Sequence, residues 1–135
     1  MRADSIRFKI RHRRVFRWLD IAVVTIILFH IGALVTTNIL SEKRNPEQKI
    51  LETNPVQSAA MGTVLEPKHI LVNIPYIMDS LGMSALVIFY VIKRIYISDE
   101  ADFKVLVGLI IILLIVSGTD FFNNLGYYIG NLIYG

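Results

Sequence analysis

Three long apolar blocks restrict what this chain can fold into, at approximately residues 16–40, 76–97 and 103–125. A helix that crosses a membrane needs about 20 mostly apolar residues, because each residue adds about 1.5 Å toward about 30 Å of hydrocarbon. All three blocks meet this length. A soluble domain of 135 residues, 54% of them hydrophobic, would instead distribute its apolar residues at helical or strand spacing. The sequence therefore predicts an integral membrane protein with three transmembrane spans.

Each span is predicted to be a helix. Lipid offers the backbone no hydrogen bonds, so a spanning segment must be a helix or part of a closed barrel, and no block alternates in polarity as a barrel strand does. We therefore expect an all-α fold, with a basic tail at residues 1–15 and a single membrane domain at residues 16–135. In this prediction residues 41–75 form the outer loop.

Basic residues near the first span predict its orientation. Seven lysines and arginines lie within the first 17 residues, against one acid, Asp4. Because loops rich in lysine and arginine stay on the cytoplasmic side, the N-terminus and the turn at residues 98–104 are expected inside and the C-terminus outside. The chain would then be a multi-pass protein of the cell membrane.

The same basic tail accounts for the net charge of +3. Anionic lipid headgroups attract each basic residue near the surface by about 1 kcal/mol, so the lipid bilayer is the expected partner and nucleic acid is not expected. Docking of a cytoplasmic protein on the tail is the alternative. The residues expected to contact headgroups and to set the topology are Arg11, Arg13, Arg14 and Arg17.

The outer loop contains a short apolar stretch of its own. Asn54 and Pro55 form a helix-start pattern, with Asn as the N-cap and Pro at the first helical position. The stretch that follows, residues 56–65, is apolar but too short to cross a membrane. It is predicted to be an interfacial or re-entrant helix.

Polar residues inside the apolar blocks are the candidates for function, because ionisable groups at hydrocarbon depth are costly. His30 lies 12 residues beyond Trp18, or about 18 Å along a helix. Asp79 and Asp120 both fall just below the predicted outer boundary, and Asn124 continues the polar helix face that Asp120 begins. The candidate intramembrane polar cluster consists of Asp79, Asp120, Asn123, Asn124, His30 and Glu52.

Two interpretations of this cluster are open. Carboxylates with one histidine can hold a divalent cation or carry protons. Alternatively, the same side chains form hydrogen bonds between helices. No cofactor is predicted, and the sequence has no cysteine and no catalytic motif such as a nucleophile elbow or HExxH. Small-residue pairs, including Gly126 with Gly130, predict that helices approach one another closely.

Three short motifs carry a resemblance to a protein family. They are Leu19-Asp20 in the first span, Glu52-Thr53-Asn54-Pro55 in the loop, and Asp120-Phe121-Phe122-Asn123 in the last span. Over approximately residues 18–125, the chain resembles an uncharacterised family of small prokaryotic integral membrane proteins. In that family an Asp opens the first helix, a Glu-x-Asn-Pro follows it, and an Asp-x-x-Asn lies in the final helix. Because that family has no settled activity, the resemblance implies no function.

The favoured prediction is a small accessory or structural subunit of a larger membrane complex, of the respiratory or oxidative enzyme type, with other integral membrane subunits as partners. Three helices bury little surface alone, no catalytic motif is present, and the polar face of the last span needs protein against it. The alternative is a protein with its own polar outer-leaflet site, either a metal-dependent enzyme or a proton-coupled carrier. A membrane anchor that recruits a cytoplasmic partner is the third possibility, and it leaves the polar residues of the spans unexplained.

Overall fold

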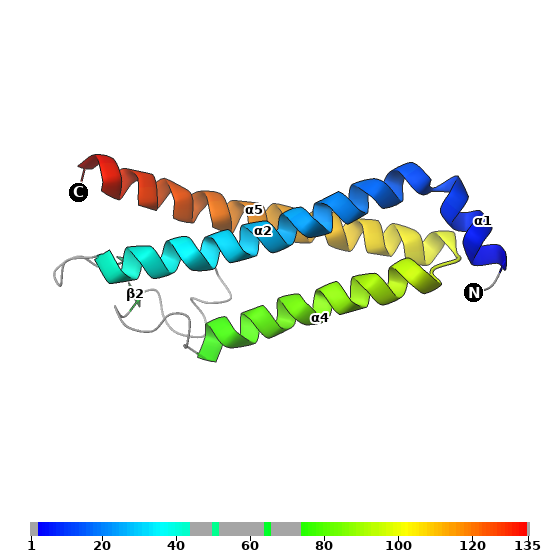
Figure 1. Ribbon diagram of the computed structural model, residues 1–135, viewed down its shortest axis with the longest axis horizontal. Helices are drawn as coiled ribbons and strands as arrows, with labels where there is room; N and C mark the ends of the chain where they lie inside the picture. The colour runs from blue at the N-terminus through cyan, green and yellow to red at the C-terminus, as the bar shows by residue number, and fades with distance from the viewer. Residues whose placement is uncertain (1–2, 44–49, 52–63, 66–73, 135) are drawn as a thin grey trace.

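The chain forms an elongated bundle of helices. The computed structural model describes residues 3–43, 50–51, 64–65 and 74–134. Three long helices run along the bundle, and a short one lies at an angle across one end (Figure 1). The elements are α1 (Ala3–Arg11), α2 (Arg13–Lys43), β1 (Ile50–Leu51), β2 (Val64–Leu65), α4 (Ile74–Tyr96) and α5 (Glu100–Tyr134). The prediction of an all-α fold is confirmed, and the described residues also include a two-stranded antiparallel ladder, β1–β2.

Two of the helices are long and apolar enough to cross a membrane. They are the part of α2 over Arg13–Thr37 and the whole of α5. The second apolar block lies in α4, which is 23 residues long. Within its described part, α4 carries three charged residues, Asp79, Lys93 and Arg94. Its role as a third span therefore stays a prediction.

Regular spacing of apolar residues explains how α2 and α5 pack together. On α2 the buried positions recur every three or four residues, from Phe16 to Ile26, and on α5 they recur in the same way from Phe103 to Ile110. Residues at this spacing share one face of a helix, so the two faces meet along a continuous seam. The buried apolar core consists of Phe16, Leu19, Val23, Ile26, Tyr90, Ile97, Phe103, Leu106 and Ile110.

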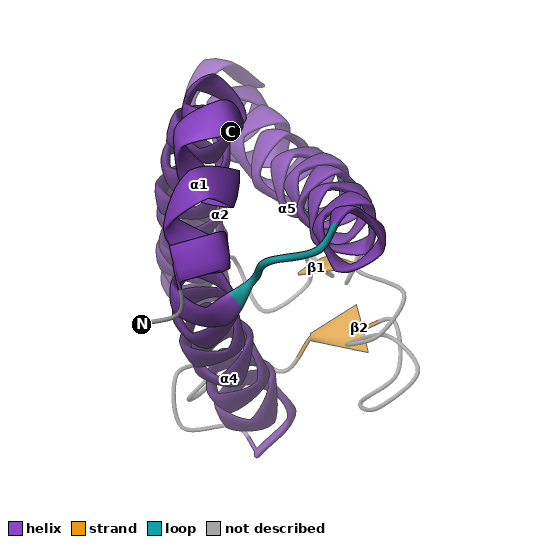
Figure 2. Cartoon of the chain, turned by 90° about the vertical axis from the view of Figure 1, so that its right-hand side faces the viewer, coloured by secondary structure: helices purple, strands orange, loops and turns teal. Residues whose placement is uncertain are grey.

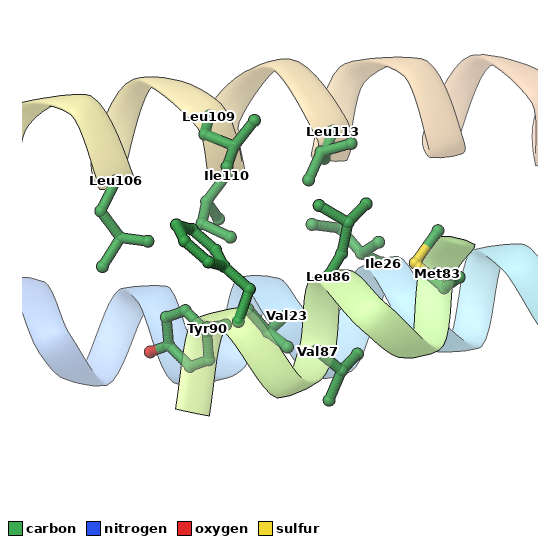
Figure 3. A pocket seen from close by; sticks show the side chains of 11 residues that line it. Val23, Ile26, Met83, Leu86, Val87, Tyr90, Leu106, Leu109, Ile110 and Leu113 are labelled. Atoms are coloured by element: carbon green, nitrogen blue, oxygen red, sulfur yellow. The ribbon is translucent and has the colours of Figure 1, made fainter. Parts of the chain in front are cut away.

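The third long helix closes the core from the other side. Figure 3 shows side chains of α2, α4 and α5 that point toward one another, among them Val23, Leu86 and Leu109. They line a cavity of about 10 Å³, enough for one water molecule at most. The middle of the bundle is therefore a packed apolar interior.

The outward faces of the long helices are also apolar. Ile21 and Leu28 on α2, Ile88 on α4, and Ile112 and Ile115 on α5 are all exposed. Isolated exposed apolar residues are ordinary on soluble proteins, but continuous faces of this kind are typical of surfaces that meet lipid or other protein.

The short helix predicted in the outer loop can be compared with the structure at its last two residues. Val64 and Leu65 form strand β2, in which Leu65 pairs with Ile50 and Val64 pairs with Leu51. The helical prediction is therefore wrong at these two positions, because backbone pairing with the segment after α2 takes them into an extended conformation. The rest of that predicted helix, residues 56–63, lies outside the described residues.

Candidate functional site

A histidine and an aspartate of the predicted polar cluster meet between α2 and α4. His30 Nδ1 lies 3.5 Å from Asp79 Oδ2, and His30 Nε2 lies 3.3 Å from Ser80 Oγ. Both side chains of the His30–Asp79 pair are partly buried. The two imidazole nitrogens thus face a carboxylate and a hydroxyl, so the ring has a partner for each nitrogen in its neutral and its protonated form. The pair can hold α4 against α2 and can bind a proton.

Asn124 of the same predicted cluster joins a different pair of helices. Its Nδ2 donates to the Ala33 carbonyl oxygen at 3.2 Å and to Thr37 Oγ1 at 2.8 Å. Ala33 and Thr37 are buried on α2, one turn apart. The polar face predicted on α5 therefore turns toward α2 at this level.

The remaining members of the predicted cluster are placed differently. Asp120 is half-buried on α5, and its Oδ1 atom is enclosed by protein. Asn123 is exposed on α5. Glu52 lies outside the described residues. Across residues 3–43 and 74–134, no group of three His, Asp or Glu side chains is arranged to hold a metal ion.

A second polar cluster lies near the other end of α2 and α4. Tyr90 Oη donates to Asp20 Oδ1 at 2.5 Å, and Arg94 reaches the same carboxylate through Nε at 3.2 Å and Nη2 at 3.4 Å. The Arg94 guanidinium also lies 4.4 Å from the centre of the Phe16 ring. This cluster joins α2 and α4 by charge-assisted hydrogen bonds and a cation–π contact, at the ends of the two helices that lie near α1 (Figure 1).

Sequence reasoning did not find this second cluster. In the sequence, Asp20 stands out only as part of the Leu19-Asp20 motif, whereas the structure pairs it with Arg94 of α4. A usable signal existed, because Tyr90 and Arg94 are four residues apart and so share a helix face. Both also lie near the cytoplasmic end predicted for the second span, as Asp20 does for the first.

The basic tail is folded, and it packs on the turn between α4 and α5. Ser5 Oγ donates to the carbonyl oxygens of Ile95 at 3.4 Å and Ile97 at 3.2 Å, and Lys9 donates to Ile95 as well. The last carbonyls of a helix have no partner inside it, so α1 provides donors that α4 lacks. Partial burial there, with the nearby charge of Arg94, lowers the pKa of Lys9.

Aromatic side chains complete the contact between α1 and the turn. Phe8 and His12 pack on Phe103, with ring centres 5.4 Å and 4.7 Å away. His12 Nε2 also lies 3.2 Å from Glu100 Oε2. Figure 2 shows the connection between α4 and α5 passing beside α1. One face of α1 therefore packs on the bundle, and its other side chains are exposed.

The four arginines that were predicted to contact headgroups lie at the end of α1 and in the first turns of α2. Arg11 of α1 and Arg13, Arg14 and Arg17 of α2 are all exposed. None of them takes part in the ion pairs found among the described residues, which use His12, His30, Lys93 and Arg94 as the basic partners.

The half of the bundle away from α1 contains a close aromatic contact between α2 and α5. Phe29 stacks on Phe121 with ring centres 5.2 Å apart, and Phe122 meets Phe29 edge-on at 5.6 Å. Each helix has a glycine against a phenylalanine ring of the other helix. Gly32 of α2 lies against Phe121, and Gly118 of α5 lies against Phe29. The two helices approach here because neither glycine has a side chain.

Comparison with protein families, with curated proteins and with solved structures found no match to this chain.

Proposed function

We propose that this protein is a three-span structural subunit of a larger membrane complex, with α2, α4 and α5 as the spans. The polar residues inside the bundle support a structural role, because they join helices to one another. His30 binds α4 through Asp79, Asn124 binds α2, and Asp20 binds Arg94. Other integral membrane subunits are the proposed partners.

The length of α5 is the observation that carries the proposal of a larger complex. Val105 and Leu132 are 27 residues apart in one continuous helix, or about 40 Å at a rise of about 1.5 Å per residue. The hydrocarbon core is only about 30 Å thick, and an ordinary tilt of about 20° shortens the helix by little. If α5 enters the membrane after Lys104, its last turns stand beyond the outer boundary.

The last turn of α5 exposes large apolar side chains, which are unfavourable in water. Leu132 is 64% exposed and Ile133 is 66% exposed. An exposed apolar helix end outside the hydrocarbon is unfavourable unless another protein covers it. We therefore propose that a neighbouring subunit packs on the end of α5 at the outer surface of the membrane.

A second function is favoured by one contact, the pair between His30 and Asp79. A titratable pair within a membrane span is a typical component of a proton path. Under this alternative the protein is a proton-coupled carrier, or a metal-dependent enzyme if residues outside the described part complete a ligand set. Both alternatives require the chain to work alone or as a homo-oligomer.

The native mass and protein content of the particle extracted from its own membrane in mild detergent test the proposal. We expect a particle much larger than a 15.4 kDa chain that contains other subunits in fixed proportion. Changing Leu132 and Ile133 to Gln should release the chain from it. The matched control is Ile10→Gln, which changes an equally exposed aliphatic residue at the opposite end of the bundle.

Two results would contradict the subunit proposal. One is a monomer or homo-oligomer in the native extract, which would direct attention to His30 and Asp79 and to metal analysis of the same sample. The other is an unchanged particle after the Leu132 and Ile133 changes, which would show that the end of α5 is not the contact.

A further inference from the structure

An exposed stripe crosses from α1 into α2 and changes its chemistry along the way. Arg7, Arg11, Arg14 and Trp18 are spaced three or four residues apart, and all four are exposed. The bend at His12 keeps helical hydrogen bonds on both sides, from His12 N to Phe8 O at 3.1 Å and from Phe16 N to His12 O at 3.0 Å. The spacing places Arg7 and Arg11 on one face of α1, and Arg14 and Trp18 on one face of α2, on the two sides of the bend.

Beyond Trp18 the same stripe becomes aliphatic. Ile21 and Leu28 continue it on α2, and both are exposed. The order along the stripe is thus three arginines, one tryptophan and then aliphatic residues. Tryptophan is enriched at the boundary between headgroups and hydrocarbon, and arginine is favoured on the cytoplasmic side of that boundary.

The helix that carries Arg7 and Arg11 is packed against the rest of the bundle. Ser5, Phe8 and His12 attach the opposite face of α1 to the turn between α4 and α5. The one acid on the stripe, Asp4, lies at its far end, a full turn before Arg7. Arg11 and Arg14 are therefore adjacent cations whose helix positions are set by the bundle.

We infer that Arg11 and Arg14, next to Trp18, form a binding site for the headgroup of an anionic phospholipid in the inner leaflet. This inference rests on the proposed function, since it requires α2 to cross the membrane. Guanidinium groups bind phosphate oxygens in a planar, two-pronged geometry, and two arginines one turn apart can share one phosphate group. The acyl chains of such a lipid would lie along Trp18, Ile21 and Leu28.

The single tryptophan of the chain makes the site measurable. The full-length protein is reconstituted into vesicles of brominated phosphatidylcholine, which quenches Trp18 from adjacent acyl chains, and unbrominated phosphatidylglycerol is added as competitor. We expect phosphatidylglycerol to relieve quenching more strongly than unbrominated phosphatidylcholine does. Changing Arg11 and Arg14 to Gln should reduce that preference by about fivefold for each arginine, which corresponds to about 1 kcal/mol per residue.

A matched control removes the same charge from the neighbouring face. Arg13 and Arg17 are exposed in the same turns, but they do not share the face of Trp18. Changing both to Gln should leave most of the preference in place, and changing Arg11 and Arg14 to Lys should restore part of it. Equal loss in the two Gln pairs would overturn the site, because it would show diffuse attraction by net charge.

The remaining outcomes separate the sources of error. Loss of the preference on adding free inorganic phosphate would overturn the lipid as the ligand, because the arginines would then bind a soluble anion. Quenching by brominated phosphatidylcholine with no preference for phosphatidylglycerol would overturn the headgroup site while leaving the membrane span intact. No quenching of Trp18 by any brominated lipid would instead contradict the proposed membrane insertion of α2.

Discussion

Replacing Phe16 with alanine is expected to lower the free energy of unfolding by about 3–5 kcal/mol, which is the usual cost of removing a buried phenylalanine. Phe16 is 1% exposed and is the largest fully buried side chain among the described residues. Its ring packs on Phe103 at 5.0 Å and supports the Arg94 guanidinium at 4.4 Å. The substitution would open a cavity where α1, α2 and α5 meet and would remove the cation–π contact that helps to position Arg94.

Phe122→Ala is the matched control for this prediction. Phe122 is 60% exposed on α5, so the same chemical change should cost about 1 kcal/mol or less. The loss of helical circular dichroism during denaturation in mixed micelles would measure both variants against the unaltered protein. Equal destabilisation by the two substitutions would contradict the assignment of Phe16 to the core.

Replacing Gly32 with valine is expected to destabilise the contact between α2 and α5 by about 1–3 kcal/mol, the usual cost of overpacking. A Cβ atom at Gly32 would lie 2.5 Å from Phe121 Cε2 and 2.8 Å from Cδ2. Phe121 has little freedom to yield, because it is stacked on Phe29 at 5.2 Å and meets Phe122 at 5.3 Å. The higher helix propensity of valine relative to glycine would offset only part of this cost.

Gly82→Val provides the comparison for Gly32→Val. A Cβ atom at Gly82 of α4 would have nothing within 4 Å, so valine there should leave stability unchanged or raise it slightly. The same denaturation measurement serves for both variants. If Gly32→Val were as stable as Gly82→Val, the close approach of α2 and α5 at this level would be wrong.

The helices could be predicted from the sequence because helix length is a local property. The apolar block at residues 16–40 lies within α2, and the block at 103–125 lies within α5. The block at 76–97 lies within α4 except for its last residue. The apolar pattern of the third block ends near residue 125, since polar residues such as Asn124 interrupt it there. In the structure the helix passes through these residues because Asn124 finds partners on α2.

The candidate site could be predicted only in part, because counting residues gives depth but not rotation about the helix axis. Depth placed His30 and Asp79 in one layer, and they are in contact. It also placed Asn124 in that layer, yet Asn124 contacts α2 and joins α5 to it, away from the His30–Asp79 contact between α2 and α4. For the same reason the contact between Asp20 and Arg94 could not be predicted.

The close packing predicted at Gly126 and Gly130 does not occur among the described residues of the chain, so it stays a prediction for contact with another protein. The pair Gly126 and Gly130 matches the pattern for close approach, but both positions are open in the structure, with nothing within 4 Å of an added Cβ. The close contacts occur at Gly32 and Gly118, which lie on different helices and so form no sequence motif. The packing of α1 on the bundle was not predicted either. The residues that make this contact, Ser5 and Phe8, stand among basic residues and form no apolar pattern in the sequence.

The side of the membrane on which the α4–α5 turn lies tests the central claim of three spans most directly. The chain has no cysteine, so single cysteines at Ser98 in the turn and at Tyr134 near the C-terminus can be labelled one at a time in intact cells. Both positions are exposed in the structure. With a membrane-impermeant maleimide, three spans predict labelling at position 134 and protection at position 98 until the cells are opened. Labelling at position 98 with protection at position 134 would contradict the account, because either α4 would not cross the membrane or the N-terminus would lie outside.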